Sequence, residues 1–276
     1  MRVWLITGAG RGVGASIAGR ALSSGDFVVA TARYPAHVRA ALGRHDRLLV
    51  LPLNVTREAH ARAAVLAAVA RVGRIDVLVN NAGYGLLGAI EEASAAEVAS
   101  LFQTNVFGLL NVTRALLPLL RKQGSGHIVN ISSIGGCAAG AGWGIYCATK
   151  LAIEAVSEAL SEEGEPLGIY TTVIDPGDPW DDFRSSIALV RTARQIEDYE
   201  EAAFAIQPFT ARGNSQLQAV RSELADEILK LVQTPEPPRR LRLRRDRARA
   251  SDFQRDTLIR EIERSGALVL PADTVC

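Results

Sequence analysis

The feature that most constrains the fold is a repeated alternation between short apolar runs rich in β-branched residues and longer stretches rich in Ala and Leu. The short runs predict strands at residues 2–7, 27–32, 47–52, 75–80, 126–131 and 168–174. The longer stretches predict helices near residues 12–24, 56–72, 95–122 and 144–163. This alternation is typical of a parallel sheet with helices on both faces, whose strands are apolar throughout. We therefore predict one α/β domain over residues 1–276 with a doubly wound parallel sheet.

Local signals set the expected bounds of the second of these helices. Asn54, Val55 and Thr56 precede Arg57 and Glu58, a pattern that predicts a helix start capped by a polar side chain. Gly73 follows the last apolar residues of the stretch and predicts the helix end.

The alternation stops after residue 175. Residues 175–215 contain prolines, glycines and charges with patchy periodicity, and a segment this long predicts a substrate-binding loop or lid. For residues 217–276 we expect a helix at about 217–233, an edge strand and a terminal helix. The arginine cluster in PEPPRRLRLRRDRARA has two interpretations, a nucleic-acid patch or an edge strand. We favour an edge strand with Leu241 and Leu243 inward and Arg240, Arg242 and Arg244 outward, because no aromatic residues interleave for base stacking.

Composition narrows the classes of partner and compartment. The formal net charge of +1 creates no field that would recruit nucleic acid or an acidic membrane. No apolar run reaches transmembrane length, and the first expected strand starts at residue 2, which leaves no room for a secretory signal. Cys137, Cys147 and Cys276 are odd in number and lack metal-ligand spacing. We predict a cytoplasmic protein with reduced thiols, no metal and no nucleic-acid or membrane partner.

A glycine-rich segment, LITGAGRGVGAS, follows the first expected strand and opens the first expected helix. Gly8, Gly10, Gly12 and Gly14 leave the backbone free to turn tightly and to approach a pyrophosphate, which the positive end of the helix dipole attracts. A flexible strand–helix turn would also use glycines. The position at the first strand–helix junction of an alternating fold favours a dinucleotide site.

The end of the second expected strand indicates which dinucleotide binds. NAD-binding chains carry an acid there for the ribose 2′-OH, whereas this chain has Thr31, Ala32 and Arg33, and its next acid is Asp46. Arg33, with Arg11 in the glycine segment, could hold a 2′-phosphate, although both could simply be solvated arginines. The missing acid favours NADP(H).

Lys150, one of only three lysines, stands four residues after Tyr146 in IYCATK. Four residues are about one helical turn, so the phenol and the ammonium would share one face. The usual Tyr pKa of about 10 is too high for a base at neutral pH, and a nearby ammonium together with a positively charged nicotinamide would lower it. The pair is therefore a candidate for acid–base catalysis beside a cofactor.

Together with NNAG at residues 80–83, Asn105 in TNVFG, ISS at 131–133 and DPG at 175–177, these segments closely resemble the short-chain dehydrogenase/reductase family. The matches run in family order through about two thirds of the chain. The resemblance implies a Rossmann-type fold, a homodimer or homotetramer formed through the helices at 95–122 and 144–163, and the catalytic residues Asn105, Ser133, Tyr146 and Lys150.

The resemblance also assigns a role to each catalytic residue. Tyr146 would exchange the substrate proton and Ser133 would orient the carbonyl, Ser133 being chosen over Ser132 because it precedes the tyrosine by the family's thirteen residues. Lys150 would tune Tyr146 and hold the ribose, and Asn105 would hold a water in the proton relay. The implied cofactor-binding residues are Gly8, Gly10, Arg11, Gly12, Val13, Gly14, Arg33, Asn54, Val55, Asn81, Ala82, Gly83, Tyr146, Lys150, Pro176 and Gly177.

Taken singly, these residues also have purely structural interpretations. Asn105 could be a polar residue satisfied by the backbone, and Ser132 or Ser133 could cap a turn.

The chain also departs from the family after DPG, where Asp181 replaces a common threonine and Pro179 stiffens the approach. Tyr84, Cys137, Trp143 and Trp180 are candidate pocket walls.

Three functions remain open at this stage. The leading one is an NADP(H)-dependent oxidoreductase that moves a hydride between nicotinamide and a carbonyl or secondary alcohol. The alternatives are a non-redox cyclase or eliminase with a structural cofactor, and a dinucleotide-sensing protein without turnover.

Overall fold

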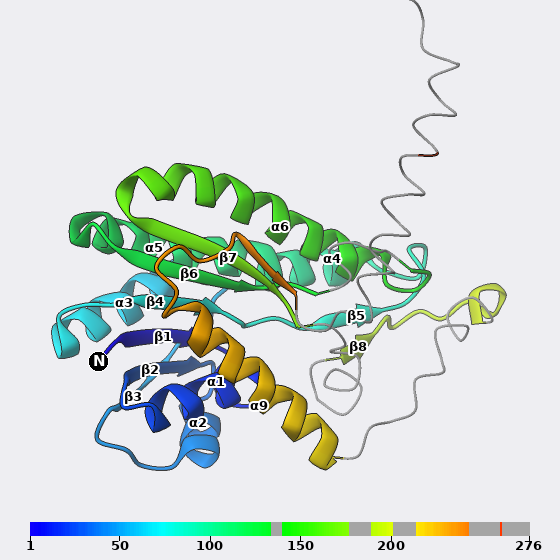
Figure 1. Ribbon diagram of the computed structural model, residues 1–276. Coiled ribbons are helices and arrows are strands. Elements are labelled where there is room, and N and C mark those ends of the chain that lie inside the picture. Colours follow the sequence, from blue (N-terminus) through cyan, green and yellow to red (C-terminus); the bar gives the residue numbers. More distant parts are fainter. Residues whose placement is uncertain (134–139, 177–188, 201–213, 243–259, 261–276) are drawn as a thin grey trace, which may run out of the picture. The chain divides into compact units, whose positions relative to one another are not determined.

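The computed structural model describes residues 1–133, 140–176, 189–200, 214–242 and 260, and side chains from residue 218 onward in the last helix (Figure 1). The chain divides into two compact units, Met1–Leu243 and Arg244–Cys276. Of the second unit only Arg260 is described, so the predicted terminal helix lies outside the described residues. The expectation of a single domain over the whole chain stays a prediction.

The main sheet is parallel and has the order β3-β2-β1-β4-β6-β7-β9. The predicted α/β fold of the Rossmann type, with a doubly wound parallel sheet, is confirmed. Six strands match the predicted ranges within two residues, and a seventh forms the edge. Their bounds are β1 Val3–Thr7, β2 Phe27–Ala32, β3 Leu48–Pro52, β4 Val77–Asn80, β6 Gly126–Ile131, β7 Ile169–Asp175 and β9 Arg240–Arg242.

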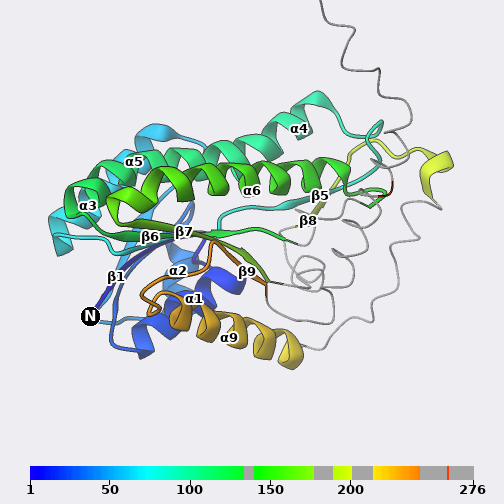
Figure 2. The ribbon, with the colours of Figure 1, turned by 45° about the horizontal axis from the view of Figure 1, so that its top comes forward.

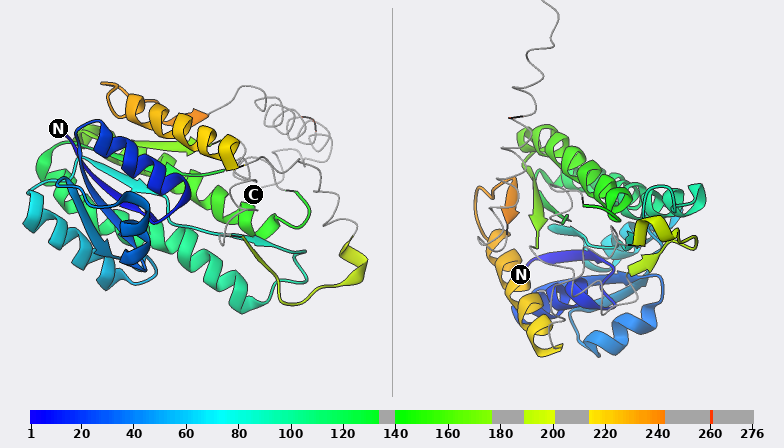
Figure 3. Two further views of the ribbon diagram at one scale, coloured as in Figure 1. Left: turned by 90° about the horizontal axis from the view of Figure 1, so that it is seen from below. Right: turned by 90° about the vertical axis from the view of Figure 1, so that its right-hand side faces the viewer.

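Helices cover both faces of this sheet (Figure 2). On one face lie α1 (Gly12–Ser23), α2 (Pro35–Leu42) and α9 (Asn214–Leu231), with α9 beside α1 (Figure 3). On the other face lie α3 (Glu58–Val72), α5 (Gly108–Gln123) and α6 (Gly144–Gly164). No described helix has both the length and the apolar character needed to cross a membrane.

The residues of β1 explain the two-sided core. Trp4 and Ile6 pack in the cluster beneath α1 and α9, while Val3 and Leu5 pack in the cluster beneath α3 and α5. Successive side chains of a strand point to opposite faces, so an uninterrupted apolar strand supplies both clusters at once.

The predicted edge strand is confirmed for Arg240–Arg242. Its two arginines are exposed and Leu241 packs partly buried against the core, as the alternation of charged and apolar residues predicts. Leu243 and Arg244 lie outside the described residues. Within the predicted loop 175–215, a strand β8 (Leu189–Arg191) pairs with β5 (Gly85–Leu87), and one 3-10 turn spans Glu197–Tyr199.

Two predicted helices differ from the structure in detail, one at its cap and one in its interior. The helix predicted from residue 56 begins at Glu58 after an N-cap Arg57 that has no side-chain cap, because the Asn54 carboxamide oxygen accepts hydrogen bonds from the amide and hydroxyl of Thr56 instead. The helix predicted over 95–122 is α4 (Ala95–Phe102), a π turn (Gln103–Phe107) and α5. The end at Gly73 is confirmed, with this glycine at a left-handed φ of 76°.

Three small elements had no predicted range. Helix α2 has eight residues, of which only Val38 is fully buried, so its apolar periodicity is weak. Strands β5 and β8 have three residues each and are recognisable only once they pair.

Candidate active site

The candidate site lies where β1, β4, β6 and β7 end. These strands are neighbours in the sheet, and because they are parallel their carboxyl ends meet at one edge. The glycine turn follows β1, residues 81–83 follow β4, and Ser132 and Ser133 follow β6. Ligands bind at this edge in open α/β sheets.

The glycine turn is tight and is tied to the end of β4. Gly8 adopts a φ of +66°, and a Cβ added at Gly14 would lie 2.7 Å from the Gly8 carbonyl oxygen. The Asn81 carboxamide donates to the carbonyl oxygens of Thr7 (3.0 Å) and Gly8 (3.3 Å), and the Thr7 hydroxyl accepts from the amides of Asn81 and Ala82, both at 3.0 Å. These contacts fix the turn before any ligand arrives.

The start of α1 suits an anionic group. Its N-cap Arg11 is extended and provides no side-chain cap, and the first turn of the helix contains no acidic residue. The amides of a helix start have no partner inside the helix, and the dipole makes this end positive. The turn and the uncapped helix start therefore fit the pyrophosphate of a dinucleotide.

Arg33 follows the end of β2 and is exposed. Burial raises the pKa of Tyr84, and the positive charge of Arg33 partly opposes this shift. Arg33 therefore lies close to the segment after β4. Arg11 is also exposed. Both guanidinium groups are therefore accessible on the side of the glycine turn.

Ser133 and Tyr146 lie together and are each 1% exposed. Burial raises the pKa of the Tyr146 phenol above its usual range, while the neighbouring Ser133 hydroxyl lowers it. Ser132 has no such effect on the phenol, which favours Ser133 as the residue that acts with it. The lowered pKa expected for Tyr146 is not found in the protein alone; for the complex with nicotinamide it stays a prediction.

Lys150 is one turn along α6 from Tyr146 and is also buried. Its ammonium donates to the Ile131 carbonyl oxygen at 3.0 Å and lies 5.6 Å from the centroid of the Tyr146 ring. Burial lowers the pKa of Lys150 to about 8, and the Glu154 carboxylate opposes this shift. At neutral pH most of this lysine remains charged.

Asn105 sits in the π turn and is buried. Its carboxamide oxygen accepts from the Tyr84 amide at 3.0 Å, and its amide group donates to the Tyr84 carbonyl oxygen at 2.9 Å and to the Thr149 hydroxyl at 3.2 Å. The Thr149 hydroxyl in turn donates to the Tyr146 carbonyl oxygen at 2.7 Å. Asn105 is thus linked to the helix that carries the phenol, and π turns are frequent at functional sites.

Comparison with known proteins identifies the family. The sequence model described as short chain dehydrogenase matches residues 2–189. The chain is 35% identical over 242 residues to the oxidoreductase BOA17 of Botryotinia fuckeliana, covering 87% of this chain and 88% of that protein. The chain belongs to the short-chain dehydrogenase family.

Further relatives agree with this assignment. A 3-ketodihydrosphingosine reductase of Bacteroides thetaiotaomicron is 37% identical over 201 residues, covering 73% of this chain and 72% of that protein. A crystal structure of a short-chain dehydrogenase from Streptomyces avermitilis superposes with a TM-score of 0.83 at 34% identity, covering 97% and 98% of the two chains. This short-chain dehydrogenase is therefore an oxidoreductase of a family that uses nicotinamide cofactors.

The predicted substrate residues are only partly described. Trp143 is buried and packs edge-on against Tyr146, with ring centroids 5.8 Å apart. It shares an apolar cluster with Leu86 and Leu101, against which Tyr84 packs. Cys137 and Trp180 lie outside the described residues, as do Pro179 and Asp181 of the unusual segment.

The remaining predicted cofactor residues surround the same edge. Val13 is half-buried against the core, and a Cβ at Gly10 would lie 3.0 Å from the His37 Cβ. Asn54 and buried Val55 follow β3, and a Cβ at Gly83 would lie 3.0 Å from Asn105 Oδ1. Gly12 opens α1, Pro176 is buried after β7, and Gly177 lies outside the described residues.

Sequence reasoning missed three residues that support this short-chain dehydrogenase site, namely Thr7, Thr149 and Glu154. Thr7 and Thr149 carry the hydrogen bonds described above. Glu154 is 8% exposed, follows Lys150 by one more helical turn, and pairs with Arg240 of β9 at 2.7 Å. An acid within the buried face of a predicted helix was the available signal for Glu154.

Proposed function

We propose that the chain is an NADP(H)-dependent oxidoreductase that transfers a hydride between nicotinamide and a carbonyl or secondary alcohol of a small organic substrate. The observation that carries this proposal is the buried group of Ser133, Tyr146 and Lys150 at the same sheet edge as the glycine turn. A binding protein would gain nothing from holding an ammonium and a phenol together in a buried position, at a cost in desolvation.

The side chains support acid–base chemistry at the carbonyl oxygen. Because burial raises its pKa, the Tyr146 phenol is protonated at neutral pH, which is the state that carbonyl reduction requires of a proton donor. Ser133 would hydrogen-bond the same oxygen. Lys150 would stabilise the phenolate left after proton transfer, and the Asn105 network would position the path for reprotonation. The bound cofactor supplies or accepts the hydride.

The choice of NADP(H) rests on Arg33. Arg33 is exposed beside the segment after β4, and no acid occupies the end of β2. Replacing Arg33 with Asp should weaken NADPH binding and shift the preference toward NADH, since the change removes a phosphate partner and adds a repulsive charge. The measurement is the ratio of dissociation constants for NADPH and NADH, with Arg39→Asp on nearby α2 as the control. An unchanged ratio in Arg33→Asp would contradict the 2′-phosphate assignment.

The buried site and the relatives support the proposed substrate class. One relative is named as a 3-ketodihydrosphingosine reductase, and the apolar cluster of Trp143, Leu86 and Leu101 beside Tyr146 suits the carbon skeleton of a ketone. The test is a screen of ketones with NADPH and of alcohols with NADP⁺, following the absorbance of reduced nicotinamide. Binding of NADPH without oxidation by any ketone would instead favour the non-redox or sensing alternatives.

We also propose that the protein acts in the cytoplasm as a homodimer or homotetramer. Phe107 of the π turn and Leu151 of α6 are about half exposed, on the helices through which family members associate. Light scattering after size exclusion tests this, and a monomer at micromolar concentration would contradict it.

A further inference from the structure

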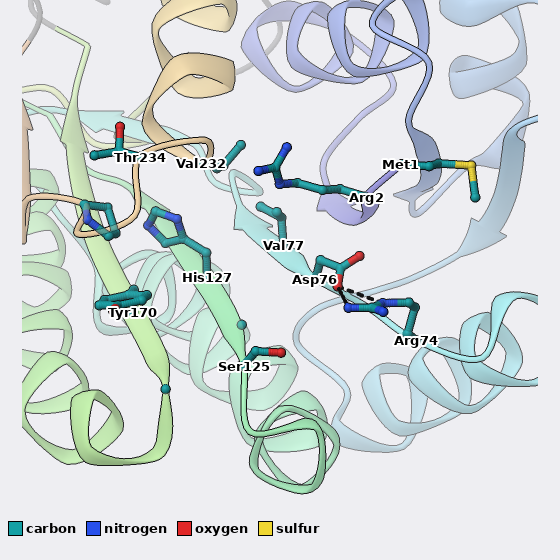
Figure 4. A pocket seen from close by; sticks show the side chains of 13 residues that line it. Met1, Arg2, Arg74, Asp76, Val77, Ser125, His127, Tyr170, Val232 and Thr234 are labelled. Atoms are coloured by element: carbon teal, nitrogen blue, oxygen red, sulfur yellow. Dashed lines mark hydrogen bonds and ion pairs between the residues drawn. The ribbon is translucent and has the colours of Figure 1, made fainter.

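A cavity of about 530 Å³ lies at the opposite edge of the main sheet, around the amino ends of β1, β4, β6 and β7 (Figure 4). Its polar lining includes Arg2, Arg74, Asp76, His127, Tyr170 and Thr234. The volume is within the range of about 300–1,000 Å³ that is usual for small-molecule sites. No residue of the candidate active site contributes to it.

Among the described residues, Arg2 is the one charged side chain of the lining that has no ion-pair partner. Arg74 donates from Nε (2.8 Å) and Nη2 (2.5 Å) to one carboxylate oxygen of Asp76, and the other oxygen accepts from the Val3 amide at 2.8 Å. The only carboxylate of the lining is therefore fully engaged. Arg2 forms no ion pair with any residue of the described ranges, and in Figure 4 its guanidinium extends across the cavity toward His127.

The tautomer of His127 follows from a chain of hydrogen bonds. The Thr172 hydroxyl donates its single proton to the Pro238 carbonyl oxygen at 2.7 Å, so toward His127 Nε2, 2.9 Å away, it can only accept. Nε2 therefore carries the proton, and Nδ1 of the neutral ring carries a lone pair. Nδ1 has no hydrogen bond with any described residue, although His127 is only 7% exposed.

The surroundings hold His127 neutral. Burial and, to a lesser extent, the charge of Arg2 lower its pKa to about 4. Tyr170 of β7 faces the ring edge-on at 6.4 Å, Asp76 of β4 is engaged as described, and the segment between α9 and β9 contributes only Val232, Thr234 and Pro237 to the lining.

We propose that this cavity is a second ligand site, which binds a phosphate group between Arg2 and His127. A monohydrogen or dihydrogen phosphate offers both partners that the lining lacks: anionic oxygens for the guanidinium of Arg2, and a P–OH donor for Nδ1 of His127. A simple carboxylate or a sulfate offers the charge without the donor. The phosphate belongs to the free ion or to the monoanion of a small phosphomonoester, which keeps one P–OH group and which the cavity volume also accommodates.

The ring of His127 reports binding directly. The chain has four histidines, and the other three, His37, His45 and His60, are exposed. Titrating inorganic phosphate, glycerol 3-phosphate and sulfate into the full-length protein at pH 6, where about half of a phosphomonoester still carries a P–OH group, should give a saturable change in the NMR signals of His127 with the first two. Sulfate should bind at least tenfold more weakly, since one hydrogen bond to a charged group is lost. If inorganic phosphate binds more tightly, the ligand is the free ion; if glycerol 3-phosphate binds more tightly, the ligand is a phosphomonoester.

Substitutions localise the effect. Arg2→Ala should weaken phosphate binding about tenfold or more, and Arg2→Lys should weaken it less, because the charge is kept. Arg71→Ala, an exposed arginine outside the cavity, and Arg33→Ala, at the expected cofactor site, should leave it unchanged. The proposal is overturned if His127 shows no saturable response, if sulfate matches phosphate, or if Arg2→Ala responds like the two controls.

Discussion

The two edges of the main sheet each contain a buried ionisable side chain, and burial affects the two differently. At the amino edge, burial lowers the pKa of His127 to about 4, so the ring is neutral at pH 7 and avoids the cost of a buried charge. At the carboxyl edge, burial lowers the pKa of Lys150 to about 8, and the side chain is still largely charged at pH 7. Of these two side chains, only Lys150, at the edge where the proposed chemistry takes place, keeps its charge at pH 7.

The difference has an energetic consequence. At about 1.4 kcal/mol per pKa unit, a shift from 10.5 to about 8 means that the charged form of Lys150 costs about 3 kcal/mol in the folded state at neutral pH. A native domain has only about 5–15 kcal/mol of stability, so this cost is large. Variants at the two edges test whether catalysis is the reason for this cost.

The largest effect is expected at the phenol of the carboxyl edge. Tyr146→Phe removes one hydroxyl and leaves the packing against Trp143, so turnover should fall by about 10²–10⁴ while the fold and NADPH affinity survive. Steady-state kinetics and cofactor titration measure both. Adjacent buried serines give a matched pair: Ser133→Ala should strongly reduce turnover, and Ser132→Ala should change it little. Near-normal turnover in Tyr146→Phe would contradict the proposed mechanism.

Replacing Lys150 should separate activity from stability. Lys150→Met keeps an unbranched chain and removes the buried charge, so turnover should be lost while the free energy of unfolding at pH 7 rises by up to about 3 kcal/mol. Urea unfolding followed by circular dichroism measures this. The stability difference between Lys150→Met and wild type should shrink as the pH rises above 8, because Lys150 of the folded wild type then loses its charge. A variant less stable than wild type at pH 7 would show that the charge is not costly.

His127 should make stability depend on pH at the amino edge. Its folded pKa of about 4 lies below the usual value of 6.5, so between these values the unfolded chain binds more protons. His127 alone should therefore remove up to about 3 kcal/mol of stability as the pH falls from 6.5 to 4. His127→Gln, which keeps an amide donor for Thr172, should flatten that part of the profile, and exposed His60→Gln should leave it as in wild type. Equal slopes in the two variants would contradict the assignment.

The smallest effect is expected at Glu154, which couples the active-site helix to the edge strand. The Glu154 charge raises the pKa of Lys150, so Glu154→Gln should move the alkaline limb of the kcat profile to lower pH. Arg240→Ala removes the competing partner of Glu154 and should move the limb to higher pH. Glu158→Gln, an exposed acid one turn further along α6, is the control. Shifts of the same sign in Glu154→Gln and Arg240→Ala would show that the pair acts only through structure.

The sequence predicted those parts of the fold and site that depend on local spacing. Apolar runs without alternation predicted the strands of a two-sided sheet, and Gly8 and Gly14 marked the tight turn at its edge. Four residues between Tyr146 and Lys150 are enough to place two groups on one helical face. Such features require only backbone geometry and side-chain period, which any short segment carries by itself.

Tertiary structure alone decided the contacts between distant segments. The sequence contains no sign that Asn105 would lie in a π turn held by the backbone of Tyr84, that Thr7 would clamp the end of β4, or that Arg240 would pair with Glu154. The state of His127 likewise depends on Thr172, Pro238 and Arg2, which come from three other segments. Hydrogen bonds and desolvation depend on which groups meet in space, and only the folded chain determines that.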